Sequence, residues 1–74
     1  MSTKEELLTR IENDFTYHAP KDDQIRRYGI IRNKFKELAI LIVNLTPVSR
    51  EQSLALTNLE HSSMMANAAI ARNE

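Results

Sequence analysis

The 74-residue chain contains no cysteine, no tryptophan and only one glycine, and its ten acidic residues balance its ten basic residues. Without cysteine it can form neither a disulfide framework nor a thiolate metal site. Its two histidines, His18 and His61, lie far apart in sequence and lack the spacing typical of metal ligands. A formal net charge of zero argues against a strongly basic nucleic-acid binder. We therefore expect no metal, no cofactor, and no DNA or RNA polymer as a partner.

Long hydrophobic runs are also absent. The longest, residues 38–43, is far shorter than the roughly 20 residues that a membrane-spanning helix needs. No basic start is followed by an apolar segment, so the sequence predicts neither a secretion signal nor a membrane partner, and we expect a cytosolic protein. A chain of this length forms only a marginally stable core, for which oligomerisation is a common remedy.

Apolar residues recur at helical spacing along the whole chain. Their pattern predicts an amphipathic helix over residues 3–15, and Pro20 breaks it because proline disfavours the helical conformation of the residue before it. A second helix is predicted from about residue 23 to about residue 45, and a third over 49–72. The fold class is therefore all-α: one domain of residues 1–74 with a short N-terminal helix and two long antiparallel helices.

Helix starts can be predicted from capping residues. Ser2-x-x-Glu5 and Ser49-x-x-Gln52 both have the form of a capping box, in which two side chains satisfy free backbone amides reciprocally. Asp22 or Asp23 can cap the second helix in the same way and complement the positive end of its dipole.

The middle helix carries a heptad pattern over nearly three repeats. One heptad position holds Tyr28, Phe35 and Ile42, and the other holds Ile31, Leu38 and Leu45. Such a stripe packs either against another helix of the same subunit or against a partner chain, and both interpretations stay open. A second apolar set, Ile30, Ala39, Leu41 and Val43, lies off the stripe and favours a further neighbour in another chain.

The third helix is rich in small residues. Ala55, Ser62 and Ala69 share one heptad position, and small side chains there allow close approach of another helix. The alternative is that alanine is simply the best helix former. Together with the middle helix, this composition leads us to expect a homo-oligomer.

Catalytic patterns are weak. The close acidic pairs at Glu5/Glu6 and Asp22/Asp23 lie at helix starts, and Glu12/Asp14 has the pattern of a solvated face. Gly29 lies inside a helix and cannot form a phosphate-binding loop. Its presence there indicates either close approach of a helix or ligand, or sequence drift. We expect no enzyme.

One group of residues indicates a ligand. Five cations occur between Arg26 and Lys36 without an acid among them, and Tyr17, His18 and Tyr28 lie nearby. Cations neutralise phosphates and flat rings stack on bases, so the group suits a compact nucleotide. The alternative interpretation is a solvated helix face.

Three stretches of the chain are similar to the small phage anti-CBASS cyclic-nucleotide sponges. They are Phe15-x-Tyr17-His18-x-Pro20 with Asp23-Gln24-x-x-Arg27-Tyr28-x-x-Ile31-Arg32, Ser49-Arg-Glu-x-Ser53-Leu-Ala-Leu-Thr57-x-Leu59-Glu60, and Ala66-Asn-Ala-Ala-Ile-Ala-Arg72. The C-terminal helix also resembles that of phage Thoeris anti-defence sponges. The chain departs from the family at Met65, where tryptophan is expected, and at His61-Ser62-Ser63, where more apolar residues are usual.

The resemblance implies a homohexamer that binds cyclic dinucleotides, such as 3′,3′-cyclic GMP–AMP, between subunits without cleaving them. Some members also bind cyclic trinucleotides at a separate site. The implied role is to keep the signal from CBASS effectors in the cytoplasm of the infected bacterial host.

The resemblance also implies roles for individual residues. Tyr17 would stack on a base of the cyclic dinucleotide and Arg32 would contact its phosphates. His18 and Tyr28 are the further candidates for this site. At the trinucleotide site, Asn67 and Arg72 are the candidates, faced by either Asn33 or Lys34.

Two other functions remain open. An adaptor protein would use the apolar faces only for assembly or to grip a partner helix, and would bind no nucleotide. A nuclease or phosphodiesterase acting on the same ligands would need a general base or metal that the sequence does not indicate.

Overall fold

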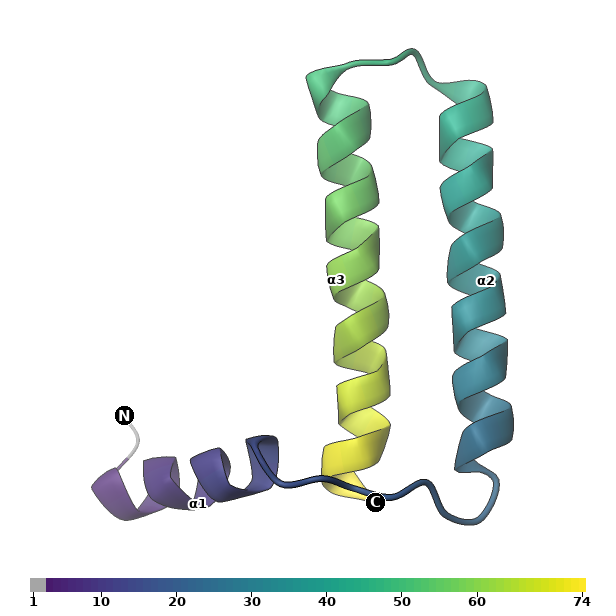
Figure 1. The fold of residues 1–74 in the computed structure, drawn as a ribbon. Coiled ribbons are helices and arrows are strands. Elements are labelled where there is room, and N and C mark those ends of the chain that lie inside the picture. The colour runs from purple at the N-terminus through teal and green to yellow at the C-terminus, as the bar shows by residue number, and fades with distance from the viewer. Residues whose placement is uncertain (1–2) are drawn as a thin grey trace.

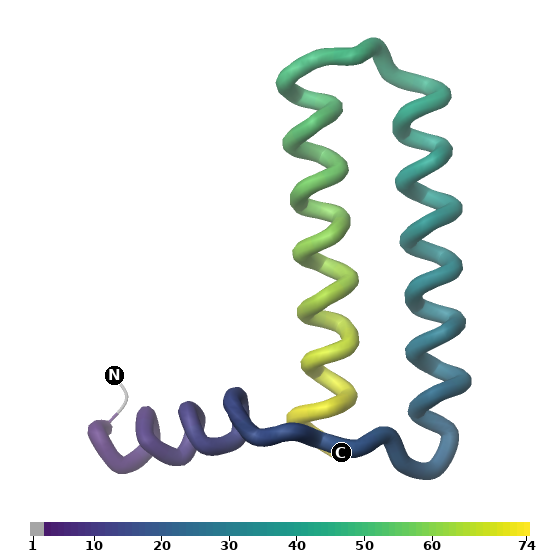
Figure 2. The backbone as a smooth tube through the Cα atoms, in the orientation of Figure 1, coloured from purple at the N-terminus to yellow at the C-terminus, as the bar shows by residue number. Residues whose placement is uncertain are grey.

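The computed structural model describes residues 3–74, and this part of the chain contains three helices and no strand. They are α1 (Lys4–Asp14), α2 (Gln24–Leu45) and α3 (Arg50–Asn73). Helices α2 and α3 lie side by side as an antiparallel hairpin, and α1 extends sideways from its base (Figure 1). The backbone trace shows the segment between α1 and α2 passing the C-terminal end of α3 (Figure 2). The predicted all-α fold is confirmed.

The start of α1 is capped by Thr3, whose hydroxyl accepts a hydrogen bond from the Glu6 amide at 3.1 Å. Ser2, the predicted cap, lies outside the described residues. The helix ends at Asp14, and Phe15 occupies the C-cap position. The predicted bounds of 3–15 therefore agree with the structure to within one residue.

The turn before α2 differs from the prediction. Asp22 has a φ of 51°, in the left-handed region that aspartate tolerates better than most residues. Asp23 occupies the N-cap position, but its side chain makes no capping hydrogen bond. Its carboxylate instead accepts from Arg26 Nη2 and Arg27 Nε, both at 3.0 Å. The prediction that an aspartate side chain caps this helix is wrong, because the Asp23 carboxylate binds two guanidinium groups one turn along the helix instead of the free backbone amides.

The tip of the hairpin confirms half of the second capping box. Ser49 Oγ accepts from the Gln52 amide at 3.1 Å, as predicted. The Gln52 side chain does not complete the box but reaches back to the end of α2. Its Nε2 donates to the carbonyl and hydroxyl oxygens of Thr46, at 3.1 and 3.0 Å.

The heptad stripe of α2 only partly faces α3. Tyr28, Ile31, Phe35 and Ile42 are half-buried, but Leu38 and Leu45 are 42% and 73% exposed. Ala39, assigned to the second apolar set, is half-buried with the stripe. The reason is geometric: a straight helix drifts by about 20° per heptad, so the residue facing a neighbour changes along its length.

Apolar side chains on the rest of α2 have no partner within the described chain. Ile30, Leu41 and Val43 are each about half exposed, and no apolar side chain among residues 3–74 is fully buried. The hairpin therefore has an apolar seam but no closed core. The expectation of a further neighbour remains a prediction that these exposed residues support.

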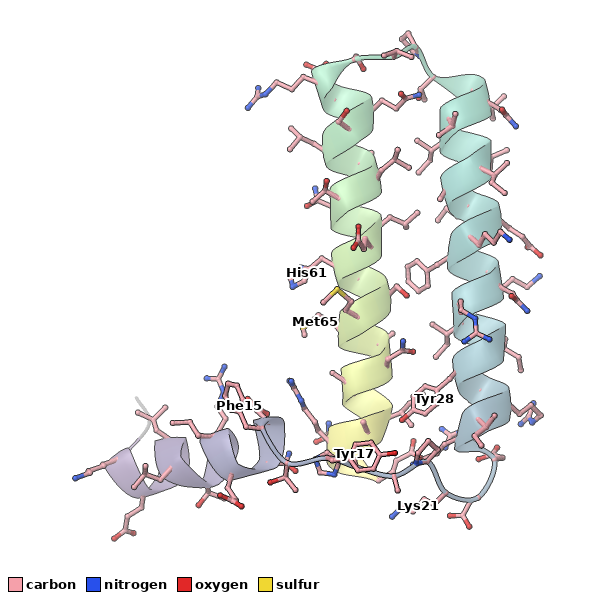
Figure 3. The ribbon with its side chains drawn as sticks, viewed as in Figure 1. Phe15, Tyr17, Lys21, Tyr28, His61 and Met65 are labelled. Atoms are coloured by element: carbon pink, nitrogen blue, oxygen red, sulfur yellow. The ribbon has the colours of Figure 1, made fainter. Side chains whose placement is uncertain are left out.

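Three of the four departures from the family pattern lie on the outer side of α3. Met65 is 48% exposed, and His61 and Ser62 are also exposed. In Figure 3 the His61 and Met65 side chains point away from α2. Ser63 differs, since it is half-buried and lines a groove together with residues of α2. The three outer departures consequently do not disturb packing inside the chain.

Gly29 has room for a larger residue. A Cβ atom added there would meet only Arg32 Nη2, at 3.8 Å, which is an ordinary contact. No close approach within the described chain therefore requires glycine at this position. None of the three helices is long and apolar enough to span a membrane.

Candidate ligand groove

An open groove of about 570 Å³ lies at the base of the hairpin. Its walls come from three parts of the chain: the segment between α1 and α2, the first turns of α2, and the last turns of α3. The lining residues are Asp14, Thr16, Tyr17, His18, Pro20, Tyr28, Arg32, Asn67, Ala68, Ala71 and Arg72.

Two tyrosines give the groove its aromatic surface. Tyr17 is 84% exposed, whereas Tyr28 is half-buried between the helices. Figure 3 shows both side chains near the C-terminal end of α3, with Phe15 pointing away from them. An exposed ring beside a half-buried ring offers a surface on which a flat ligand can stack.

The third ring, His18, is oriented by the end of α1. Its Nε2 lies 2.8 Å from the carbonyl oxygen of Asn13, which can only accept a hydrogen bond. Nε2 is therefore the donor in this contact. This bond also fixes the start of the segment that carries Tyr17.

The two arginines of the groove have different environments. Arg32 makes no ion pair within residues 3–74. Arg72 Nε lies 3.4 Å from Asp14 Oδ1, and the Arg72 carbonyl accepts from Asn13 Nδ2 at 3.2 Å. These contacts tie the end of α1 to the last turn of α3. The prediction that Asp14 belongs to a solvated face is wrong, since its carboxylate is partly buried against Arg72.

Asn67 contributes an unpaired polar group to the wall formed by α3. Its Oδ1 is buried and has no hydrogen-bond partner. A buried acceptor without a partner destabilises a fold by about 1–3 kcal/mol.

A polar clamp of Gln24, Arg27 and Glu74 joins the walls at the base. Gln24 is the one fully buried residue of the described chain, at 4% exposure. Its Oε1 accepts from the Lys21 amide at 3.1 Å, and its Nε2 donates to Glu74 Oε1 at 3.2 Å. Arg27 donates to both carboxylate oxygens of Glu74, with Nη1 at 2.8 Å from Oε2.

The clamp shifts the pKa values of its charged members. The hydrogen bond from Arg27, and next that from Gln24, lower the pKa of Glu74 to about 2. The same Glu74 contact raises the pKa of Arg27 above its ordinary value. Both groups therefore stay charged throughout the physiological range.

Six of the eight candidate residues lie together in this groove. Sequence reasoning divided them between two sites, but the structure places Asn67 and Arg72 in the same groove as Tyr17, His18, Tyr28 and Arg32. Asn33 and Lys34 do not line it, and Lys34 pairs with Glu37 at 3.3 Å.

Sequence reasoning missed the clamp and the role of Asp14. Their contacts join residues 47 to 59 positions apart, and no local pattern signals such pairs. Within residues 3–74, no three histidine or acidic side chains gather where they could hold a metal ion.

Comparison with known proteins identifies a family. The family model described as Acb2/Tad1, hairpin domain, matches residues 8–71, which include most of α1 and nearly all of the hairpin. No curated protein and no solved structure matches the chain significantly.

Proposed function

Because the chain belongs to the Acb2/Tad1 hairpin family of anti-CBASS and anti-Thoeris sponges, we propose that it sequesters a cyclic dinucleotide such as 3′,3′-cyclic GMP–AMP. The ligand is held intact and kept from the CBASS effector in the cytoplasm of the infected bacterium. The observation that carries this proposal is the groove in which Tyr17 and Tyr28 lie beside the unpaired Arg32.

The contacts of the groove suit both chemical parts of a cyclic dinucleotide. Stacking on an aromatic side chain stabilises a bound base by about 1–3 kcal/mol. A guanidinium without an internal partner forms charge-assisted hydrogen bonds to a phosphodiester. Tyr17 therefore stacks on a base, with Tyr28 and His18 beside it, and Arg32 contacts a phosphate.

The proposed assembly is a homo-oligomer, a hexamer as the resemblance implies. Its support is the lack of any fully buried apolar side chain in residues 3–74 and the exposed apolar face of α2. Neighbouring subunits would bury that face and enclose the open groove. Ligand binding would then stabilise the assembly by mass action.

A cyclic trinucleotide is the second proposed ligand, bound through Asn67 and Arg72. In one chain Asn33 and Lys34 lie outside the groove that contains these two residues. The proposal therefore brings Asn33 or Lys34 from a neighbouring subunit.

An adaptor function is the alternative, and the same exposed apolar side chains favour it. An adaptor would form an oligomer or bind a partner helix, and would have no affinity for nucleotides. Replacing Tyr17 would then have no effect on any ligand.

The test isolates a complex with 3′,3′-cyclic GMP–AMP by gel filtration, denatures it and identifies the nucleotide released. Intact nucleotide from an oligomeric peak supports the sponge. Linear products would indicate an enzyme, and failure with both this ligand and a cyclic trinucleotide would leave the adaptor.

Tyr17→Ala and Phe15→Ala form a matched pair for the same experiment. The two rings are 84% and 86% exposed and lie two residues apart, but only Tyr17 lines the groove. We expect Tyr17→Ala to weaken binding roughly ten- to hundredfold through lost stacking. Phe15→Ala should leave it unchanged, and equal losses in both variants would contradict the assigned groove.

A further inference from the structure

The five cations between Arg26 and Lys36 are not equivalent in the structure. Three of them are neutralised by acids of the same chain: Arg26 by Asp23 at 3.0 Å, Arg27 by Asp23 and Glu74, and Lys34 by Glu37 at 3.3 Å. The remaining two, Arg32 and Lys36, make no ion pair within residues 3–74. Within this group of five, the positive charge that is available to a ligand therefore comes from Arg32 and Lys36.

These two residues lie one helical turn apart on the same flank of α2. Side chains at this spacing have Cβ atoms about 5–6 Å apart and project from one face. Arg32 lines the ligand groove at the base and also a second groove of about 390 Å³ farther along the hairpin. Lys36 lines only the second groove. Arg32 is thus the boundary between the two grooves, and Lys36 is the next cation along the same surface.

The second groove is apolar apart from a few charged or polar side chains. Phe35 and Ala39 of α2 line it together with Leu56 and Leu59 of α3. Glu60 lines it from α3 and makes no ion pair with Lys36. The aliphatic stem of a lysine can lie along such a surface while its ammonium group stays at the rim.

We propose that Lys36 is a second phosphate-binding residue, which contacts one phosphodiester of the cyclic dinucleotide while Arg32 contacts the other. This inference rests on the proposed function, because a cyclic dinucleotide carries two phosphates and Arg32 is the one arginine of the base-stacking groove that has no ion pair within residues 3–74. The Glu60 carboxylate, which lines the same groove, repels the phosphate. This repulsion limits the contribution of Lys36 to binding to that of one charged hydrogen bond.

The experiment measures binding of 3′,3′-cyclic GMP–AMP by titration calorimetry to the wild type, Lys36→Met and Lys4→Met. Methionine keeps an apolar stem and removes the charge. Lys4 is the matched control, since it is another exposed lysine without an ion pair within residues 3–74, and it lines neither groove. We expect Lys36→Met to weaken binding about tenfold, as for the loss of one charged hydrogen bond. Lys4→Met removes the same charge outside both grooves and should change the affinity by less than about twofold.

Two further readouts separate a phosphate contact from a structural effect. Raising the salt from about 50 to about 300 mM should weaken binding less in Lys36→Met than in the wild type, because one screened attraction has been removed. Lys36→Arg should restore most of the affinity. Equal affinities of Lys36→Met and Lys4→Met, or a salt dependence of Lys36→Met equal to that of the wild type, would overturn the role of Lys36. Absence of binding to the wild type would instead overturn the proposed function.

Discussion

Polar contacts stabilise both ends of the α2–α3 hairpin, but they join residues at very different separations in the sequence. At the tip, Thr46, Ser49 and Gln52 bond to one another across three to six residues. At the base, Gln24 and Arg27 bond to Glu74, and Asn13 bonds to Arg72, across 47 to 59 residues.

The two ends also differ in what they leave unpaired. The donors and acceptors at the tip satisfy one another. The base contains the unpaired Arg32 and the buried Asn67 Oδ1 without a partner, and both line the groove. The comparison indicates that local contacts end helices, whereas long-range contacts bring together the groups that a ligand can use.

The largest effect is expected from the two glutamines. Gln24→Leu leaves the Lys21 amide and the Glu74 carboxylate without one partner each, so the free energy of unfolding should fall by about 1–3 kcal/mol. Affinity for the cyclic dinucleotide should fall as well, because the clamp joins the walls of the groove. Urea denaturation at fixed protein concentration and titration calorimetry measure the two quantities.

Gln52→Leu is the control at the tip. Its side chain also makes two hydrogen bonds, here to the carbonyl and hydroxyl oxygens of Thr46, but it does not line the groove. We expect a lower stability, by about 0.5–1.5 kcal/mol, and an unchanged affinity. If Gln52→Leu weakened ligand binding as much as Gln24→Leu, the distinction between base and tip would fail.

A smaller effect is expected from the N-cap of α3. Ser49→Ala removes the acceptor of the Gln52 amide and should lower the free energy of unfolding by about 1 kcal/mol. Ser49→Gly should lower it by only a few tenths of that amount, because water reaches the free amide more easily beside glycine. Both variants should bind ligand as the wild type does, and a loss of affinity in Ser49→Ala would show that the tip also shapes the groove.

The smallest effect is expected in the loss of stability at acidic pH, which Glu74→Gln should change. The pKa of Glu74 is about 2 in the folded protein, below its ordinary value of 4.5. A group whose pKa is depressed by folding stabilises the protein above its ordinary pKa, and this contribution declines as the pH falls from about 4.5 towards 2. Glu74→Gln should therefore flatten the loss of stability in this range, as followed by urea denaturation at a series of pH values.

Part of the acid dependence should survive in Glu74→Gln. The hydrogen bond from Arg26 contributes most to lowering the pKa of Asp23, which titrates with the same sign. Glu37→Gln controls for the loss of an exposed carboxylate, since its partner Lys34 lies outside the clamp. A profile of Glu74→Gln identical to that of the wild type would show that the clamp does not contribute to stability.

Much of the fold could be predicted from the sequence because helices depend on local order. Periodic apolar residues, Pro20 and the Ser49 cap placed the three helices to within one or two residues. The stripe on α2 was less predictable. Leu38 belongs to the heptad but is exposed, and Ala39 takes its place, because helix drift depends on how the two helices pack.

The candidate site was only partly predictable. The aromatic rings and cations near Tyr17 and Arg32 stand out in the sequence. The assignment of the candidate residues to two separate sites, however, depended on the resemblance. Asp14 and Gln24 carry no local signal, since their partners Arg72 and Glu74 lie at the other end of the chain.

The sequence by itself determined three helices, their order and their ends, because backbone hydrogen bonds and caps join residues only a few positions apart. The tertiary structure decided the ion pairs between distant residues. It joins Arg27 to Glu74 and Arg72 to Asp14, whereas Arg26 and Lys34 pair with acids one helical turn away in the same segment. The physical reason is that an ion pair needs two groups within about 4 Å, and only the folded chain brings distant groups that close.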